Sequence, residues 1–139
     1  MATSSRAVVE EVLRAGRELD IEAFVDSMAP DGYIEWPFRP AGVPGRLQGR
    51  AEIRDHLART AGSLVTFDEY RDVVIHETVD PEVVIVEYEA HGTVVATGAP
   101  FVQTVIAVFR VQDGQIVSYR DYLNPLPLAE ALAGATAVP

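Results

Sequence analysis

The chain contains no cysteine among its 139 residues, which excludes disulfide bonds, thiol nucleophiles and thiolate metal ligands. It also has no apolar run that approaches the roughly 18 residues of a membrane-spanning helix. Residues 1–20 lack the order of a secretion signal, in which charged residues precede an apolar stretch. Since disulfides and an export signal are both missing, we expect a cytoplasmic protein.

Positive charge is also scarce, with 11 Lys and Arg residues against 21 Asp and Glu residues and a formal net charge of −10. Nucleic acids and anionic membrane surfaces are bound through basic patches, so we expect neither as a partner. The histidines His56, His76 and His91 lack the spacing of metal ligands, and no glycine-rich phosphate or dinucleotide motif is present. We therefore expect neither a metal nor another cofactor.

Apolar residues make up 48% of the chain, and its length suits a single domain, which we place over residues 1–139. Local patterns predict helices that begin after Ser4 or Ser5, after Asp20 and at residue 50, a turn at residues 30–32, strands over residues 33–38, 67–78, 83–95, 101–111 and 115–123, and a short last helix over residues 128–133. Helices first and antiparallel strands last is the order of an α+β fold. A strongly curved sheet wrapped over the three N-terminal helices would leave a cone open at one end, which is a default ligand site.

The last two strands form the strongest local signal. An Asp-Gly pair at residues 113–114 stands between two apolar runs and predicts a β-hairpin with a two-residue turn. In that register Val111 pairs with Ile116, and Ile106 lies opposite Asp121. The face that carries Asp121 would also carry Val117, Tyr119, Leu123, Thr104 and Val108.

Asp121 is thereby predicted on a mostly apolar strand face. A carboxylate there must be paired, solvated in a pocket or held protonated, and the last two conditions suit an acid–base catalyst. The alternative is a salt bridge to Arg110 or Arg120, although strand neighbours point to opposite faces, which disfavours Arg120. Gln103 would share the other face with Tyr122, at the pocket mouth or a dimer surface, unless a β-bulge reverses its parity.

The first strand offers two alternative walls for the pocket. One face carries Tyr33 and Glu35, and it would bring a second carboxylate toward Asp121. The other face carries Trp36 and Phe38, an aromatic wall that suits a flat ligand. We favour the aromatic wall, with ordinary core packing as the alternative for Trp36.

Three further residues are candidates for the site. His56 lies on the inward stripe of its helix, where it is either a core histidine or a second acid–base group. Tyr88 and Tyr119 either pack or donate hydrogen bonds to a substrate carbonyl. The expected substrate-binding set is Tyr33, Trp36, Phe38, Tyr88, Thr104 and Tyr119, with Glu35 and Gln103 as further candidates.

The chain resembles the nuclear-transport-factor-2-like superfamily, and within it the SnoaL-like polyketide cyclases and ketosteroid-isomerase-like proteins, through DGYIEWPF at residues 31–38, GRAEIRDH at residues 49–56 and VFRVQDGQIVSYRDYLNP at residues 108–125. The resemblance implies a cone-shaped α+β barrel with an antiparallel or mixed sheet. The tail also resembles that of the phenazine-biosynthesis members, which place an acidic residue at the position of Asp121 and a histidine at that of His56. The resemblance therefore nominates these two residues for catalysis. Limonene-type epoxide hydrolases share the fold, but their Asp-Arg-Asp constellation has no convincing place on this sequence.

These observations favour a small cofactor-independent enzyme of secondary metabolism, a cyclase or isomerase that uses acid–base chemistry on an apolar, oxygenated, cyclic molecule. The alternatives are a non-catalytic ligand-binding or scaffold module of the same fold and an epoxide hydrolase-type cyclase. A homodimer is also expected, because the outer sheet face, taken to carry Val83, Ile85, Val105, Ala107 and Phe109, is too apolar for open solvent.

Overall fold

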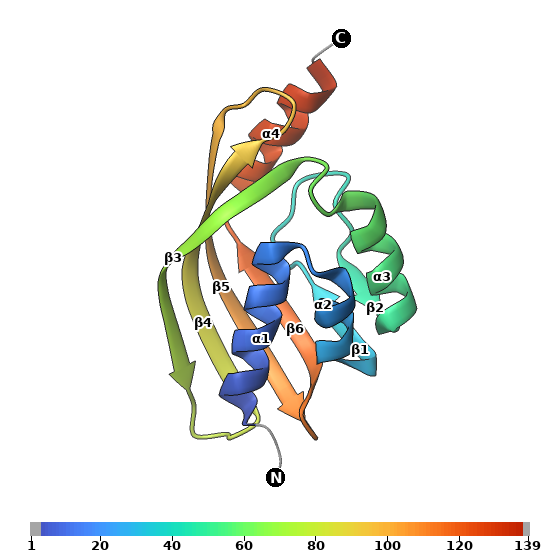
Figure 1. The fold of residues 1–139 in the computed structure, drawn as a ribbon, viewed down its shortest axis with the longest axis vertical. Helices are drawn as coiled ribbons and strands as arrows, with labels where there is room; N and C mark the ends of the chain where they lie inside the picture. Colours follow the sequence, from blue (N-terminus) through green and yellow to red (C-terminus); the bar gives the residue numbers. More distant parts are fainter. Residues whose placement is uncertain (1–3, 138–139) are drawn as a thin grey trace.

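The computed structural model describes residues 4–137. In chain order its elements are α1 (Ser5–Glu18), α2 (Ile21–Ser27), β1 (Met28–Glu35), β2 (Arg46–Gln48), α3 (Gly49–Thr60), β3 (Val65–Glu77), β4 (Val83–Val94), β5 (Pro100–Gln112), β6 (Gln115–Leu123) and α4 (Pro125–Ala137). Figure 1 shows a strongly curved sheet with α1 and α2 against its concave side, α3 beside β1 and β2, and α4 at the opposite end from the N-terminus.

The six strands form one sheet in the order β2-β1-β6-β5-β4-β3. β1 and β6 pair in parallel, and every other neighbouring pair is antiparallel. The predicted α+β class with a curved, mixed sheet is therefore confirmed. The parallel pair joins the two strands that carry the main candidate residues, although they lie far apart in the sequence.

Side-chain caps start the first two helices, as predicted. Ser4 accepts a hydrogen bond from the backbone N–H of Ala7, and Asp20 accepts one from the N–H of Ala23 at 3.2 Å. α1 continues past Gly16 and ends before Leu19, whose left-handed backbone (φ 58°) closes the last turn. The apolar faces of these helices pack against the inner face of the sheet in the main core.

The turn predicted at residues 30–32 is wrong, because the structure continues β1 through this segment from Met28. Gly32 is required here for a close approach rather than for a turn. A Cβ atom on Gly32 would lie only 2.6 Å from the carbonyl oxygen of Ile116 on β6. The glycine thus lets the two parallel strands pack closely where their register shifts.

The β5–β6 hairpin begins in the predicted register, with Val111 opposite Ile116. A bulge then leaves Val117 without a partner, so that Asp121 lies opposite Ala107. The predicted pairing of Asp121 with Ile106 is therefore wrong by one residue. Since strand faces alternate, this slip exchanges the inner and outer residues along the whole of β5.

The corrected register also changes the composition of the outer face. Val105, Ala107 and Phe109 are buried on the inner face, opposite the buried residues of β4, and not on the outer face as predicted. The outer face of β5 instead exposes Val102 and Ile106, at 41% and 45%. Within residues 4–137, no helix is both long and apolar enough to cross a membrane.

Two irregularities bend β3. Its pairing with β4 shifts between Phe67 and Glu69 and again between Arg71 and Val74. Asp72, inside the second shift, has a left-handed backbone with φ 54°. Bulges of this kind bend a strand, and here they fold the sheet over the space in front of it.

Candidate active site

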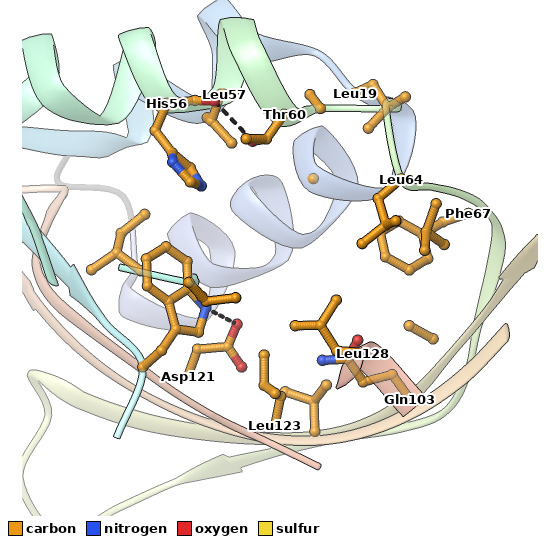
Figure 2. Close-up of a pocket in the computed structure, with 18 of the residues that line it drawn as sticks. Leu19, His56, Leu57, Thr60, Leu64, Phe67, Gln103, Asp121, Leu123 and Leu128 are labelled. Atoms are coloured by element: carbon orange, nitrogen blue, oxygen red, sulfur yellow. Dashed lines mark hydrogen bonds between the residues drawn. The ribbon is translucent and has the colours of Figure 1, made fainter. Parts of the chain in front are cut away.

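A cavity of about 440 Å³ lies between the concave face of the sheet and the helices α1, α3 and α4 (Figure 2). Its wall is mostly aliphatic and aromatic. Of the described residues that line it, Asp121 alone carries a carboxylate, and none is Lys or Arg. Its other polar side chains include Trp36, His56, Thr60, Ser63, Tyr70, Tyr88, Gln103 and Tyr119. Residues 4–137 hold no cluster of three side chains suited to a metal ion.

β6 directs Asp121 into this cavity from the corrected inner face. Its Oδ2 accepts a hydrogen bond of 3.2 Å from the indole Nε1–H of Trp36, while its buried Oδ1 has no hydrogen-bond partner among the described residues. Burial raises the pKa of the Asp121 carboxyl to about 7, against the smaller opposing effect of the Trp36 hydrogen bond. Both the protonated and the ionised forms are therefore populated at neutral pH.

The alternative salt bridges of Asp121 are not formed. Arg110 instead contacts Asp80 and Glu82, at 3.2 and 2.9 Å. Arg120 points to the other side of the strand and donates a 3.4 Å hydrogen bond to the hydroxyl of Tyr122. Since no described Lys or Arg pairs with Asp121, the effect of burial on the pKa of its carboxyl is not offset by a salt bridge.

His56 reaches the same cavity from α3, across from Asp121 in Figure 2. Its ring centroid lies 5.9 Å from that of Trp36, and no described residue hydrogen-bonds to its imidazole. Burial lowers its pKa below the usual value, with a further contribution from Arg59. The imidazole is thus neutral at pH 7, with one nitrogen as donor and the other as acceptor.

Three tyrosines form an aromatic cluster in the cavity wall. The rings of Tyr70 and Tyr88 stack with centroids 4.6 Å apart, and Tyr119 packs on Phe109 at 4.3 Å. Burial raises the pKa of all three hydroxyls, that of Tyr70 to about 12. All three hydroxyls are therefore protonated at pH 7, and those of Tyr88 and Tyr119 hydrogen-bond each other. Sequence analysis missed Tyr70, because the two bulges of β3 hide which of its residues face inward.

Gln103 is a buried polar residue on the inner face of the hairpin. The bulge at Val117 reverses its parity and brings it to the same face as Asp121. Its side chain is part of the cavity wall and has no hydrogen-bond partner among residues 4–137, although only 8% of the residue is exposed.

The structure places four sequence candidates outside the cavity. The Tyr33 ring lies under the guanidinium of Arg46, 3.6 Å from its centroid, and Glu35 pairs with the same Arg46 at 3.5 Å. Phe38 is 59% exposed, because the strand ends at residue 35 and the chain turns away. Thr104 is exposed on the outer face of β5.

Phe38 packs instead against the ring of Tyr122, 5.8 Å away on the outer side. Of the two residues in the predicted aromatic wall, only Trp36 lines the cavity. Its neighbour on the same face, Ile34, also lines it. Of the sequence candidates, the cavity brings together Asp121, His56, Trp36, Tyr88, Tyr119 and Gln103.

Comparison with known proteins gives the family. A model of the SnoaL-like domain matches residues 9–119, which is most of the chain. The chain belongs to the SnoaL-like family. It is 34% identical over 134 residues to an uncharacterized PhzA/B-like protein of Pseudomonas aeruginosa, covering 96% of this chain and 94% of that protein.

Solved structures of the SnoaL-like and related folds agree with this assignment. A Bacillus subtilis protein provisionally described as an isomerase superposes with a TM-score of 0.84 at 30% identity, over 95% of this chain and 97% of that one. An epoxide hydrolase of the LEH-like type from M. tuberculosis superposes with a TM-score of 0.66 at 25% identity, over 98% and 95% of the two chains. The SnoaL-like chain thus shares its fold with proteins assigned to different reactions.

Proposed function

We propose that this SnoaL-like protein is a cofactor-independent enzyme that moves a proton to or from a carbon next to a carbonyl group, in an uncharged cyclic substrate. The observation that carries the proposal is the Oδ1 atom of Asp121, which is buried in a mostly apolar cavity without a hydrogen-bond partner among the described residues. Leaving such an atom without a partner is costly for the fold and favours the protonated carboxyl, and the Asp121 side chain itself lines the cavity in which a substrate would bind.

Asp121 acts first as the base in this scheme. Its ionised form takes a proton from the α-carbon, the C–H electrons form the enolate, and Asp121 becomes neutral. In an isomerisation, Asp121 returns the proton to a different carbon. In a cyclisation, the enolate carbon bonds to a second carbonyl carbon, and the proton goes to the resulting alkoxide. A carboxyl group whose pKa is about 7 suits both directions of transfer at neutral pH.

Neutral donors around Asp121 would stabilise the enolate oxygen. His56 lies across the cavity, and the hydroxyls of Tyr70, Tyr88 and Tyr119 are protonated at pH 7 because burial raises their pKa values. Donors fixed in a water-poor cavity stabilise a developing negative charge more strongly than they would in water. The apolar wall also protects the reactive enolate from solvent.

Hydrogen–deuterium exchange at C1 of 2-tetralone, a bicyclic ketone, tests this proposal without knowledge of the natural substrate. We expect the protein to accelerate exchange in D₂O above the buffer rate, and Asp121→Asn to lose at least about 100-fold of that acceleration. Equal rates for the wild type and Asp121→Asn, over 2-tetralone and a panel of larger cyclic ketones, would contradict the proposal.

Epoxide opening is less well supported by the cavity. The Asp-Arg-Asp constellation of limonene-type enzymes needs an arginine and two carboxylates, whereas the described lining has one carboxylate and no arginine. A non-catalytic binding module would keep ligand affinity but show no exchange in the experiment above.

The homodimer stays a prediction, which sedimentation equilibrium of the wild type and of Ile106→Glu, on the outer face, would test.

A further inference from the structure

The amide of Gln103, which faces the cavity, has no role in the proton transfer described above. Only 8% of this residue is exposed, and its side chain has no hydrogen-bond partner among residues 4–137. Among the described residues, only Oδ1 of Asp121 is a fully buried side-chain atom without a partner, so the amide atoms of Gln103 are accessible from the cavity, where water or a ligand can satisfy them. Since Gln103 lines the cavity, its partner has to come from the cavity itself.

The register of the hairpin fixes how far this amide lies from Asp121. Asp121 is opposite Ala107, and Gln103 is four residues away on the same face of β5. At about 3.3 Å per residue, the two backbone positions lie about 13 Å apart along the strand. Figure 2 shows Gln103 and Asp121 along the sheet side of the cavity, with Leu123 between them.

The interval between the two polar groups is apolar. Leu123 pairs with Val105, and both residues line the cavity between the amide and the carboxyl. A ligand that reaches both groups must therefore cover this pair with an apolar body. The mostly apolar lining and the aromatic groups around it suit a flat, fused-ring skeleton.

The lack of cationic side chains in the described lining limits which polar groups a ligand can carry. The described lining contains no Lys or Arg that would pair with a carboxylate or phosphate, and Gln103 is uncharged. A primary amide offers both donors and an acceptor, which match a hydroxyl or a carbonyl oxygen. An anionic group in this cavity would be desolvated without a counter-ion, at high cost.

We propose that Gln103 is a specificity-determining residue, which hydrogen-bonds a second oxygen of an uncharged fused-ring ketone at the end opposite to the reacting carbon. This inference rests on the proposed proton transfer at Asp121 and adds the substrate class. It predicts that affinity depends on a distal oxygen, whereas the chemistry at Asp121 does not need that oxygen.

The test compares the affinities of 2-tetralone and of its 5-, 6- and 7-hydroxy derivatives by isothermal titration calorimetry. We expect one hydroxy isomer to bind the wild type about tenfold more tightly than 2-tetralone, the effect of one well-formed hydrogen bond. Gln103→Met, which keeps the length of the side chain but removes the amide, should abolish this preference. Thr104→Val is the matched control, because Thr104 is the next residue on the outer face, and it should keep the preference.

Asp121→Asn separates this inference from the proposed function. If the preference survives in Asp121→Asn while exchange is lost, both proposals stand. If Asp121→Asn keeps both exchange and the preference, the function proposal fails and the role of Gln103 in binding stands. No binding of any of the four ketones, equal affinities for all four, or an unchanged preference in Gln103→Met would overturn the inference about Gln103.

Discussion

The indole Nε1–H of Trp36 donates a 3.2 Å hydrogen bond to Oδ2 of Asp121, which joins the end of β1 to the inner face of β6. This bond stabilises the ionised carboxylate, whereas burial stabilises the protonated form. The pKa of about 7 is the balance of the two effects, with burial the larger. Trp36 is therefore a positioning residue that also adjusts the proton affinity of Asp121.

Replacing Trp36 by Phe should raise the pKa of Asp121 further. The substitution removes the only hydrogen bond to the carboxylate among the described residues and keeps an aromatic ring in place. A hydrogen bond to a charged group corresponds to about one pH unit, and we expect an increase of that size. Carbon-detected NMR titration of the Asp121 carboxyl measures it. Tyr33→Leu, a change outside the cavity, should leave the value unchanged; an unchanged or lower value in Trp36→Phe would contradict the account.

The same pKa predicts how stability depends on pH. Below about pH 4, Asp121 is protonated in both the folded and the unfolded chain and has no effect on stability. Between about pH 4 and 7 the unfolded chain releases this proton while the folded chain retains it, so the free energy of unfolding falls as pH rises. Above pH 7 the loss is complete and amounts to at most about 4 kcal/mol.

Asp121→Asn isolates this contribution, because other carboxyls such as Asp20 and Asp80 have lowered pKa values and contribute with the opposite sign. We expect Asp121→Asn to be more stable than the wild type at pH 8, with a difference that shrinks toward pH 4. Urea unfolding of both proteins at pH 4.5, 6 and 8 measures it. A difference that is independent of pH would mean that the folded pKa of Asp121 is not raised.

The parts of the fold that depend on local chemistry can be predicted from the sequence. Ser4 and Asp20 cap their helices because their short oxygen-bearing side chains reach the first free N–H groups. The inner face of β4, including Val84 and Val86, follows from regular alternation along an unbroken strand.

Features that depend on pairing between strands cannot be predicted from the local sequence. At Val117 the pairing of β6 with β5 is interrupted, and the pairing of β6 with β1 shifts at the same place. No residue type in this segment predicts the bulge. Its one-residue slip places Gln103 inside the cavity and Thr104 outside, the reverse of the prediction from a regular hairpin. The role of Gly32 also depends on a neighbouring strand. The sequence alone does not distinguish a glycine that permits close packing from one that forms a turn.

The pH dependence of the exchange reaction should follow Asp121 and not His56. The base is the ionised carboxylate, so the rate should rise with pH to a plateau, with a midpoint near 7. The pKa of His56 is lowered from its usual value of 6.5, because burial disfavours the charged ring, so a His56 base would give a midpoint below that value. His56→Gln should therefore reduce the maximal rate about tenfold through a lost hydrogen bond while the midpoint stays near 7. A midpoint that disappears in His56→Gln would assign the base to His56 instead.

Gly16→Ala should stabilise the protein, although Gly16 lines the cavity. This residue lies in the last turn of α1, where glycine costs about 0.5–1 kcal/mol relative to alanine. A Cβ atom would lie 3.5 Å from the hydroxyl oxygen of Tyr70 and 3.8 Å from the Phe24 ring, which are ordinary contacts. Urea unfolding should show a gain of that size. The same change at Gly42, whose backbone has φ +90°, should destabilise instead, because alanine is strained there whatever the space around it. A loss of stability in Gly16→Ala would contradict this account, because it would mean that the added methyl group is strained against Tyr70 or Phe24.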